Sequence, residues 1–420
     1  DPLWSRGLGD LYKRQLEERI KMNQTLVQHL REKEQRMKEI RRYLHENPEL
    51  SFEENETSKY IANFYKDKDC LVETNVGPNG IKVTIAGKHP GKTIAIRADF
   101  DALPIKEETE LPYASKNEGV MHACGHDAHT AYMLILGETL IEMKDQLRGN
   151  VVIIHQPAEE MPPGGAKGMI DDGVLEGVDH VLGAHVMSMM ETGKIYYREG
   201  FVQTGRAYFR LVVKGQGGHG SSPHTSNDAI VAGAHFVTTA QTIVSRRLNP
   251  FETGVVTIGS FDGKGQFNVI KDTITIEGDV RALTDDTRDN IQNEMTRLVR
   301  GLEEMFGVIC DFEFKKDYPA LYNDPEFTSY VATTLKNAKL DDIKAIDICE
   351  PQPPSEDFAF YALERPSTFI YSGAAPEDGP MYPHHHPKFN INETSMLVVA
   401  EAVGTCLLYT SDAADEEDSV

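Results

Sequence analysis

Continuous apolar runs that end in polar residues recur along this chain, with helical segments between them. Residues 151–154 are all Val or Ile and lead into the polar segment 155–160, and residues 93–96 lead into the acidic segment 97–101. Apolar runs without alternation are typical of strands covered on both faces, and segments such as 130–143 are suited to be the covering helices. The pattern predicts an α/β/α domain with a buried, mixed and mostly parallel sheet.

Between residues 204 and 314 the order of the expected elements changes. The pattern there predicts strand, helix, strand, strand, helix and strand at 207–213, 227–247, 254–258, 273–280, 286–306 and 308–314. This β-α-β-β-α-β order is that of a split ferredoxin-like α+β domain. We therefore expect an inserted domain at 204–314 within a discontinuous domain formed by 16–203 and 315–405.

Both ends of the chain differ from the rest. Residues 5–15 (SRGLGDLYKRQ) and 406–416 (CLLYTSDAADE) resemble translated adapter sequences and show no period suited to a core. We expect residues 1–15 and 406–420 to be non-native tails outside the fold.

Composition narrows the class of protein. The formal net charge of −23 comes without a basic stripe, which disfavours nucleic acid as a partner. The longest apolar run, near 131–136, is too short to span a membrane, and no charged and apolar leader opens the chain. Five scattered cysteines do not suggest a disulfide framework. We expect a cytoplasmic protein.

The segment 121–129 (MHACGHDAH) concentrates metal-binding side chains. Cys124 and His126 form a Cys-x-His pair, which can present a thiolate and an imidazole to one ion. Asp127, one residue further, is expected to orient a ligand ring without touching the ion. The alternative is a buried cysteine beside solvated histidines.

Further candidate ligands follow other predicted strands. Glu159 and Glu160 are adjacent carboxylates, which repel each other unless cations or a shared proton offset them. His185 follows an apolar run, and His385 lies in a run of three histidines. Taken singly, these residues also fit a solvated acidic loop, a core histidine and an exposed loop. Together, nitrogen, sulfur and oxygen ligands with a nearby base match a two-metal hydrolytic site.

Seven ordered motifs extend this pattern over nearly all of residues 39–403: RADFDALPI, MHACGHDAHTA, HQPAEE, LGAHV, GGHGSSPH, SEDF and HHHPKF. Their order resembles the amidohydrolase branch of the metallopeptidase superfamily that contains aminoacylase and glutamate carboxypeptidase. That branch includes hippurate hydrolase, indole-acetyl-amino-acid hydrolase and N-acetyl-diaminopimelate deacetylase. The resemblance implies that two divalent ions bind to Cys124, His126, Glu160, His185 and His385, with Glu159 as general base.

The resemblance also assigns roles outside the ligand set. His219 would hold the oxyanion, and in dimeric members this histidine reaches the site of a partner subunit, so the inserted domain would be a lid and dimerisation domain. Asn268 and Arg281 would hold the substrate carboxylate, although Asn268 could instead cap a turn and Arg281 could pair with a neighbouring acid. Asp99 and Asp101 would orient the ligands.

Three departures from the family pattern concern substrate fit and register. Pro354 precedes the SEDF motif where glycine is usual, and Lys271 stands where proline is usual. The extra histidine at 384–386 leaves the register of the last ligand open. His385 is preferred because it stands two residues before Pro387.

The resemblance implies a metal-dependent amidohydrolase that cleaves N-acyl or N-aroyl amino acids. Zn²⁺ or Mn²⁺ is expected, and Co²⁺ or Ni²⁺ would also suit the donor set. The expected partners are a small-molecule substrate and, through the inserted domain, a second copy of the chain. The alternatives are a dipeptidase or carboxypeptidase of the same superfamily, and a non-catalytic protein that binds an acyl-amino acid.

Overall fold

A computed structural model describes residues 19–410, and these form two compact units. The first comprises the described residues up to Gly200, Tyr322–Glu350 and the chain from Phe360 onward. The second comprises Phe201–Leu321 and Pro351–Ala359. Residues 351–359, which the sequence analysis placed in the discontinuous domain, group with the second unit, because Gln352 N–H donates to Val202 O (2.8 Å) and Arg281 Nη1 donates to Ser355 Oγ (3.1 Å).

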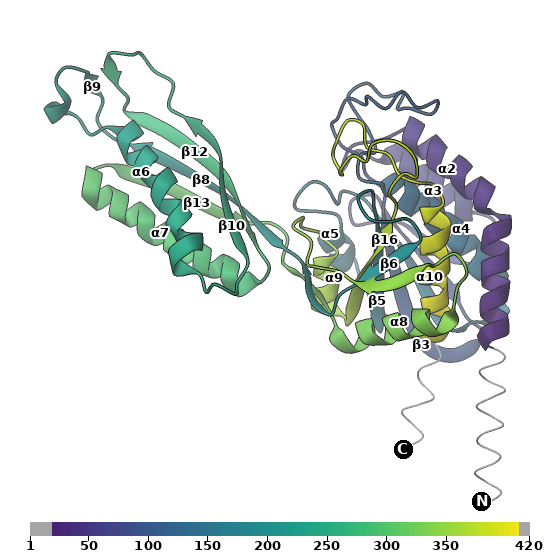
Figure 1. Cartoon of the computed structure of the whole chain (residues 1–420). Coiled ribbons are helices and arrows are strands. Elements are labelled where there is room, and N and C mark those ends of the chain that lie inside the picture. Colours follow the sequence, from purple (N-terminus) through teal and green to yellow (C-terminus); the bar gives the residue numbers. More distant parts are fainter. Residues whose placement is uncertain (1–18, 411–420) are drawn as a thin grey trace, which may run out of the picture. The chain divides into compact units, whose positions relative to one another are not determined.

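The first unit is built around an eight-stranded sheet with the order β1-β2-β4-β3-β5-β16-β6-β15 (Figure 1). Strands β4, β3, β5 and β16 are mutually parallel. The antiparallel pairs are β1 with β2, β2 with β4, and β6 with β16. The predicted mixed, mostly parallel sheet is confirmed. The strands are β1 Leu71–Val76, β2 Gly80–Ala86, β3 His89–Asp99, β4 Arg148–Gln156, β5 His180–Met187, β6 Lys194–Tyr197, β15 Ala345–Ile348 and β16 Ser367–Gly373.

Helices cover both faces of this sheet, which confirms the α/β/α layers. Figure 1 shows α2, α4 and α10 on one side and α5 and α9 on the other. Helix α4 is buried on all sides because it is apolar around its circumference and packs against α2, α10 and β3. The bounds are α2 Glu34–Glu46, α3 Asn55–Tyr65, α4 His126–Glu142, η1 Lys144–Gln146, α5 Ala166–Asp171, α8 Pro325–Ala338, α9 Ala359–Glu364 and α10 Ser395–Thr410, and residues 19–32 are also helical.

The expectation that the chain leaves the fold at residue 406 is wrong for the last turn of α10. Cys406, Leu407 and Leu408 are buried and join the core of the first unit. Their three apolar side chains continue the buried face of α10, which was not predicted from the sequence. The expected tails at 1–15 and 411–420 lie outside the described residues.

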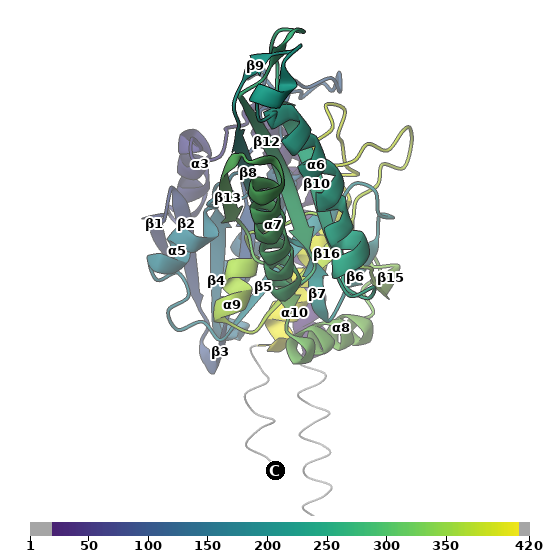
Figure 2. The ribbon, with the colours of Figure 1, turned by 90° about the vertical axis from the view of Figure 1, so that its left-hand side faces the viewer.

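The second unit contains a four-stranded antiparallel sheet with the order β10-β12-β8-β13. Figure 2 shows α6 and α7 side by side on the near face of this sheet, where Phe209, Phe236 and Met295 are part of the core. The predicted β-α-β-β-α-β order is confirmed. The elements are β8 Gly205–Lys214, α6 Ala229–Thr242, η3 Ile243–Arg247, β10 Gly254–Asp262, β12 Thr273–Ala282, α7 Asp285–Phe306 and β13 Ile309–Lys316.

Smaller elements complete the description. Strands β9 (Gly218–His219) and β11 (Val269–Ile270) form a two-stranded ribbon in the second unit, next to η2 (Pro223–Thr225). The chain passes between the two units along β7 (Gly200–Gln203) and β14 (Leu321–Asn323). Within residues 19–410, no helix combines the length and the apolar character needed to cross a membrane.

Candidate metal centre

The carboxyl ends of β3, β4 and β5 lie side by side at one edge of the central sheet. Asp99 of β3 is paired with Gln156 of β4, and Arg97 of β3 is paired with Gly183 of β5. His185 follows Gly183 by two residues and so starts from the same edge. Open α/β sheets bind their ligands at this edge.

A sharp turn at Gly125 brings the Cys-x-His pair to that edge. Gly125 precedes α4 with a φ of 93°, a left-handed conformation that favours glycine. A Cβ atom at Gly125 would lie 2.6 Å from Val186 Cγ2 on β5. The absence of a side chain at this residue therefore lets Cys124 and His126 approach β5 closely.

The five predicted ligands gather into one cluster in the first unit. Cys124, His126 and His185 each offer a donor atom within 4.8 Å of the others, and so do Cys124, Glu160 and His385. Cys124 Sγ is 3.6 Å from His185 Nε2, and Glu160 Oε1 is 3.1 Å from His385 Nε2. The side chain of His385 is 50% exposed, whereas those of His126 and Glu160 are buried.

The histidine rings present the nitrogen that a metal needs. His126 Nδ1 lies 3.0 Å from Asp101 O and 3.1 Å from Asp101 Oδ1, and His185 Nδ1 lies 2.7 Å from Val186 O. His126 Nε2 is buried and has no hydrogen-bond partner among the described residues. A buried nitrogen without a partner is costly unless an ion takes the lone pair. The donor set of thiolate, imidazole and carboxylate therefore fits divalent metal ions.

Asp101 connects the ring of His126 to the acidic pair. Besides its contact with His126, its carboxylate accepts the Glu160 N–H (3.0 Å) and the Ser51 hydroxyl (2.7 Å). Burial would raise the pKa of Asp101, but the contacts with His126, Glu160 and Ser51 bring it below the ordinary value. Asp101 thus stays ionised and can hold His126 Nδ1–H.

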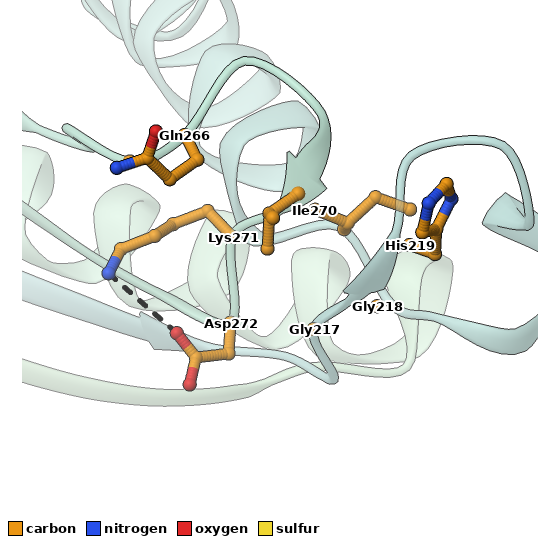
Figure 3. A pocket seen from close by; sticks show the side chains of 9 residues that line it. Gly217, Gly218, His219, Gln266, Ile270, Lys271 and Asp272 are labelled. Atoms are coloured by element: carbon orange, nitrogen blue, oxygen red, sulfur yellow. Dashed lines mark ion pairs between the residues drawn. The ribbon is translucent and has the colours of Figure 1, made fainter.

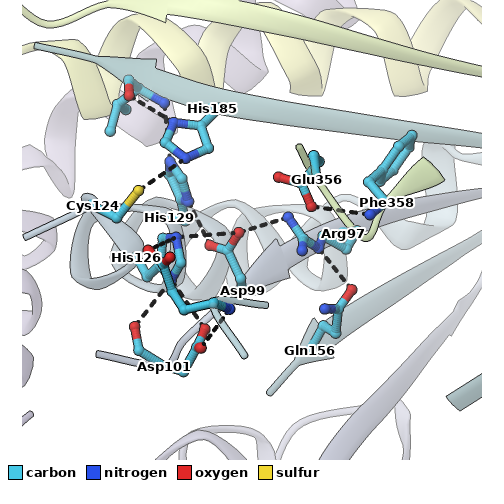
Figure 4. A network of polar contacts seen from close by, with 12 residues as sticks. Arg97, Asp99, Asp101, Cys124, His126, His129, Gln156, His185, Glu356 and Phe358 are labelled. Carbon is cyan, nitrogen blue, oxygen red and sulfur yellow. Dashed lines mark hydrogen bonds and ion pairs between the residues drawn. The ribbon is translucent and has the colours of Figure 1, made fainter. Parts of the chain in front are cut away.

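Asp99 occupies a second buried network at this edge (Figure 4). Its carboxylate accepts from Arg97 Nη1 and from His129 Nδ1, both at 2.6 Å, and lies 3.7 Å from His126 Nε2. Burial would raise the pKa of Asp99, but Arg97, His126 and His129 hold it well below the usual range. The guanidinium of Arg97 thus balances the charge of this carboxylate and keeps it ionised beside the cluster.

No role for His129 was predicted from the sequence. Its Nδ1 donates to Asp99, and its Nε2 accepts the Val186 N–H (3.0 Å), so its ring links β3 to β5 beside the cluster. The available signal was its spacing, because residues three apart on a helix share a face and His129 follows His126 by three.

Glu159 is 7% exposed, and one of its carboxylate oxygens lies within 4.8 Å of donor atoms of His126 and Glu160.

Burial, with Glu160 and Glu159 nearby, holds the pKa of the Cys124 thiol well above its usual value. A metal must therefore displace a proton from this thiol in order to bind it.

Asp127 does not occupy the position expected for it. Its carboxylate accepts from Arg41 Nε (3.0 Å) and lies 2.8 Å from His45 Nδ1, both on α2, rather than contacting a predicted ligand ring within the described part of the chain. Consecutive helix residues point about 100° apart, so Asp127 faces α2 while His126 faces the cluster. Its role here is to tie the start of α4 to α2.

The three histidines at 384–386 have different surroundings. His384 Nδ1 donates to Cys124 O (3.2 Å) and lies 3.5 Å from Cys124 Sγ, while its Nε2 accepts the Ser188 N–H (3.3 Å). Burial lowers the pKa of His384 to about 3, so this ring is neutral. Both of its nitrogens are engaged by the backbone, whereas His385 directs Nε2 at Glu160.

His219 and Asn268 lie together in the second unit. His219 is paired with Val269 across the β9-β11 ribbon, and Gly220 N–H donates to Asn268 O (2.9 Å). The His219 ring is exposed and accepts the Ser221 N–H through Nδ1 (3.2 Å). It borders a cavity of about 550 Å³, drawn in Figure 3. The lining residues are Gly217, Gly218, His219, Gly265, Gln266, Val269, Ile270, Lys271 and Asp272.

Arg281 lies near the opposite end of β12 from this ribbon. It is eight residues beyond Thr273, or on the order of 25 Å along a strand. Its Nε donates to Asp279 (2.7 Å) and its Nη1 to Ser355 Oγ (3.1 Å), so it does pair with a neighbouring acid. The structure therefore does not bring Arg281 and Asn268 of one chain together around one carboxylate.

Comparison with known proteins identifies the class of enzyme. Residues 95–408 match the model described as "Peptidase family M20/M25/M40". A Bacillus subtilis protein named "Putative amidohydrolase YhaA" is 43% identical over 89% of this chain and 94% of its own length. The N-acetyl-L-cysteine deacetylase of B. subtilis is 37% identical (85% and 84%), as is thermostable carboxypeptidase 1 of Saccharolobus solfataricus (87% and 92%).

Solved structures agree with these relatives. A "putative aminohydrolase" from methicillin-resistant Staphylococcus aureus superposes with a TM-score of 0.89 at 71% identity, over 93% of this chain and 100% of that one. The YxeP protein of B. subtilis, described as a dinuclear metal-binding peptidase of the M20 family, has a TM-score of 0.78 at 31% identity (90% and 98%). This chain is a metal-dependent hydrolase of amide bonds and belongs to peptidase family M20/M25/M40.

Proposed function

We propose that this enzyme hydrolyses N-acyl or N-aroyl amino acids to a carboxylic acid and an amino acid. The observation that carries the proposal is the cluster of Cys124, His126, Glu160, His185 and His385 with the buried Glu159 beside it. A base next to a set of metal ligands is what activation of water for amide hydrolysis requires. The names of the amidohydrolase and deacetylase relatives point to the same substrate class.

The five ligands would hold two divalent ions, with Zn²⁺ or Mn²⁺ first among the candidates and Co²⁺ or Ni²⁺ also suited to the donors. When bound, these ions supply Lewis-acid polarisation of the amide carbonyl and lower the pKa of water. Asp101 and Val186 O keep Nδ1 protonated on His126 and His185, so that Nε2 of each ring is free to coordinate.

Glu159 moves the proton in this mechanism. It takes a proton from water as the oxygen attacks the carbonyl carbon, and it then donates that proton to the leaving nitrogen. Because the charge on the carbonyl oxygen grows during the attack, a donor aimed at this oxygen accelerates the reaction. We assign this donation to His219, whose exposed ring lies between glycines at 218 and 220 that let the backbone approach a substrate closely.

The second unit suggests how the substrate carboxylate is bound. Asn268 and Arg281 of one chain are separated by most of the length of β12 and cannot contact the same carboxylate. We therefore propose a homodimer in which His219 and Asn268 come from one copy and Arg281 from the other. The bidentate guanidinium of Arg281, already oriented by Asp279, suits a carboxylate.

Glu159→Gln tests the proposal, because glutamine keeps the shape of the side chain and cannot accept the proton. We expect kcat on an N-acyl amino acid to fall by roughly 10²–10⁴-fold with an unchanged metal content. Hydrolysis at the wild-type rate by metal-loaded Glu159→Gln would contradict the role of Glu159 as the base.

A carboxypeptidase or dipeptidase is the second candidate, because one relative is named a thermostable carboxypeptidase. Comparing kcat/KM for N-acetyl, N-benzoyl and N-indoleacetyl amino acids with that for free dipeptides separates the two candidates. A preference for dipeptides would replace the proposed substrate class while leaving the metal chemistry in place.

A further inference from the structure

The turn between β4 and the acidic pair holds a residue in an unusual backbone conformation. Ala158 has a φ of 55°, in the left-handed region that residues with a side chain rarely adopt, and it is completely buried. Ala158 immediately precedes Glu159, so its conformation sets the direction in which the Glu159 side chain leaves the backbone. Such a conformation persists only when its surroundings hold it.

Glu54, at the start of α3, stabilises this turn through a hydrogen bond to its backbone. The Glu54 side chain is completely buried, and its Oε1 accepts the Ala158 N–H at 2.8 Å. Ala158 O in turn accepts the Gly165 N–H at 3.2 Å. Both backbone polar groups of Ala158 are therefore fixed, one of them by a side chain that lies 104 residues away in the sequence.

The segment that carries Glu54 touches the acidic pair at a second point. Ser51 donates to Asp101 Oδ2, the same oxygen that accepts the Glu160 N–H. The turn at 51–54 thus supports the backbone of Ala158 directly and that of Glu160 through Asp101.

The carboxyl of Glu54 is in a setting that favours its neutral form. Burial raises its pKa to about 8, with the nearby Asp101 carboxylate adding to the rise. Its second oxygen, Oε2, has no hydrogen-bond partner among the described residues. A neutral carboxyl offers the Ala158 N–H the same carbonyl oxygen as a glutamine amide would, so Gln is a close substitute here.

We propose that Glu54 is a positioning residue for amide hydrolysis, which fixes the left-handed turn at Ala158 and thereby directs Glu159 toward the substrate. Glu54 acts through the Ala158 backbone and needs no contact with the substrate. The inference rests on the proposed role of Glu159 as the base.

The test compares Glu54→Ala with Glu54→Gln in the full-length, metal-loaded enzyme. We expect Glu54→Ala to lower kcat by about tenfold or more with KM within about twofold of the wild-type value, because substrate contacts are unchanged while the base is misdirected. Glu54→Gln keeps the acceptor and should stay within about threefold of the wild-type kcat. If Glu54→Ala does not fold, Glu54→Asp, whose carboxyl stops one methylene short of Ala158, gives the same comparison.

Glu49→Ala is the matched control. Glu49 belongs to the same segment, and its carboxylate accepts the N–H groups of Glu56 (3.1 Å) and Thr57 (2.8 Å) at the start of α3, away from the acidic pair. Its loss should lower the melting temperature and leave kcat unchanged. Thermal melting and metal content measured on every variant separate loss of fold or of metal from loss of positioning.

Two outcomes would overturn the inference: wild-type kcat in folded Glu54→Ala, or equal losses in Glu54→Gln and Glu54→Ala. Glu159→Gln distinguishes this failure from failure of the proposed function. An inactive Glu159→Gln beside a fully active Glu54→Ala removes only the positioning role, whereas an active Glu159→Gln removes the proposed mechanism itself.

Discussion

The ligand cluster of the first unit and the His219 ribbon of the second unit are built in opposite ways. In the cluster, the buried rings of His126 and His185 are each fixed by a second contact on the nitrogen that faces away from the other ligands. In the ribbon, the His219 ring is exposed and is held through neighbouring Ser221. The cluster is thus preorganised by its own unit, whereas the His219 ring lies on the surface of its unit.

The apolar surface of the ribbon supports this contrast. Phe267, next to Asn268, is fully exposed, and Val269 is 53% exposed. Exposed apolar side chains beside polar recognition residues are typical of surfaces that contact another molecule. Metal binding by the cluster can therefore be tested in a single chain, whereas the roles proposed for His219 and Asn268 depend on the proposed homodimer.

Removal of metal should have the largest effect on hydrolysis, and its effect on stability should be confined to the first unit. We expect a chelator to abolish hydrolysis and to lower the unfolding temperature of the first unit, because ions at about 100 times their Kd stabilise a fold by ~2.7 kcal/mol. The second unit should melt unchanged. Calorimetry and elemental analysis of the full chain before and after reloading with Zn²⁺, Mn²⁺, Co²⁺ or Ni²⁺ would measure both. Undiminished hydrolysis by demonstrably metal-free protein would contradict the role proposed for the ligand cluster.

His219→Ala should give the next largest effect and should leave the cluster intact. Loss of one oxyanion donor lowers kcat by roughly 10²–10³-fold, and the metal content should not change because the ribbon supplies no ligand. His224→Ala is the control, since His224 is also exposed and lies in η2 beside the ribbon. A drop in bound metal in His219→Ala would show that the two regions are not independent.

Glu54→Gln should give the smallest effect, visible as a change in pH dependence. The pKa of Glu54 is raised to about 8 by folding, so its contribution to stability is present at low pH and is lost as the pH rises toward 8. Between pH 5.5 and 7.5, the free energy of unfolding of wild type should fall relative to Glu54→Gln by up to ~1.4 kcal/mol per pH unit. Urea titrations at three pH values would measure this, and parallel curves for the two proteins would contradict it.

Much of the fold was predictable because its signals are local. Apolar runs predicted β3, β4 and β5, and the order of strands and helices predicted the ferredoxin-like sheet of the second unit. The end of α10 was missed because its last apolar turn was assigned to a tail. An apolar face of three residues is too short to predict a buried helical turn without knowledge of the surface on which it packs.

The candidate ligands were also visible in the sequence, because Cys124 and His126, or Glu159 and Glu160, carry their chemistry at fixed short spacing. The direction of a side chain was less visible. Asp127 was expected to orient a ligand, yet it faces Arg41 and His45 on α2. Spacing along the chain does not say which neighbouring helix will cover which face.

Local sequence patterns thus predicted the layered α/β plan, the inserted β-α-β-β-α-β unit and the candidate metal ligands, since each depends on residues a few positions apart. Packing between distant segments decided that His384 contacts backbone atoms while His385 lies against Glu160. It also decided that Arg281 lies near the end of β12 that is far from the ribbon beside Asn268, and that Glu54 accepts the Ala158 N–H. These features depend on packing between segments that are distant in the chain, and burial, not spacing, selects which polar groups meet.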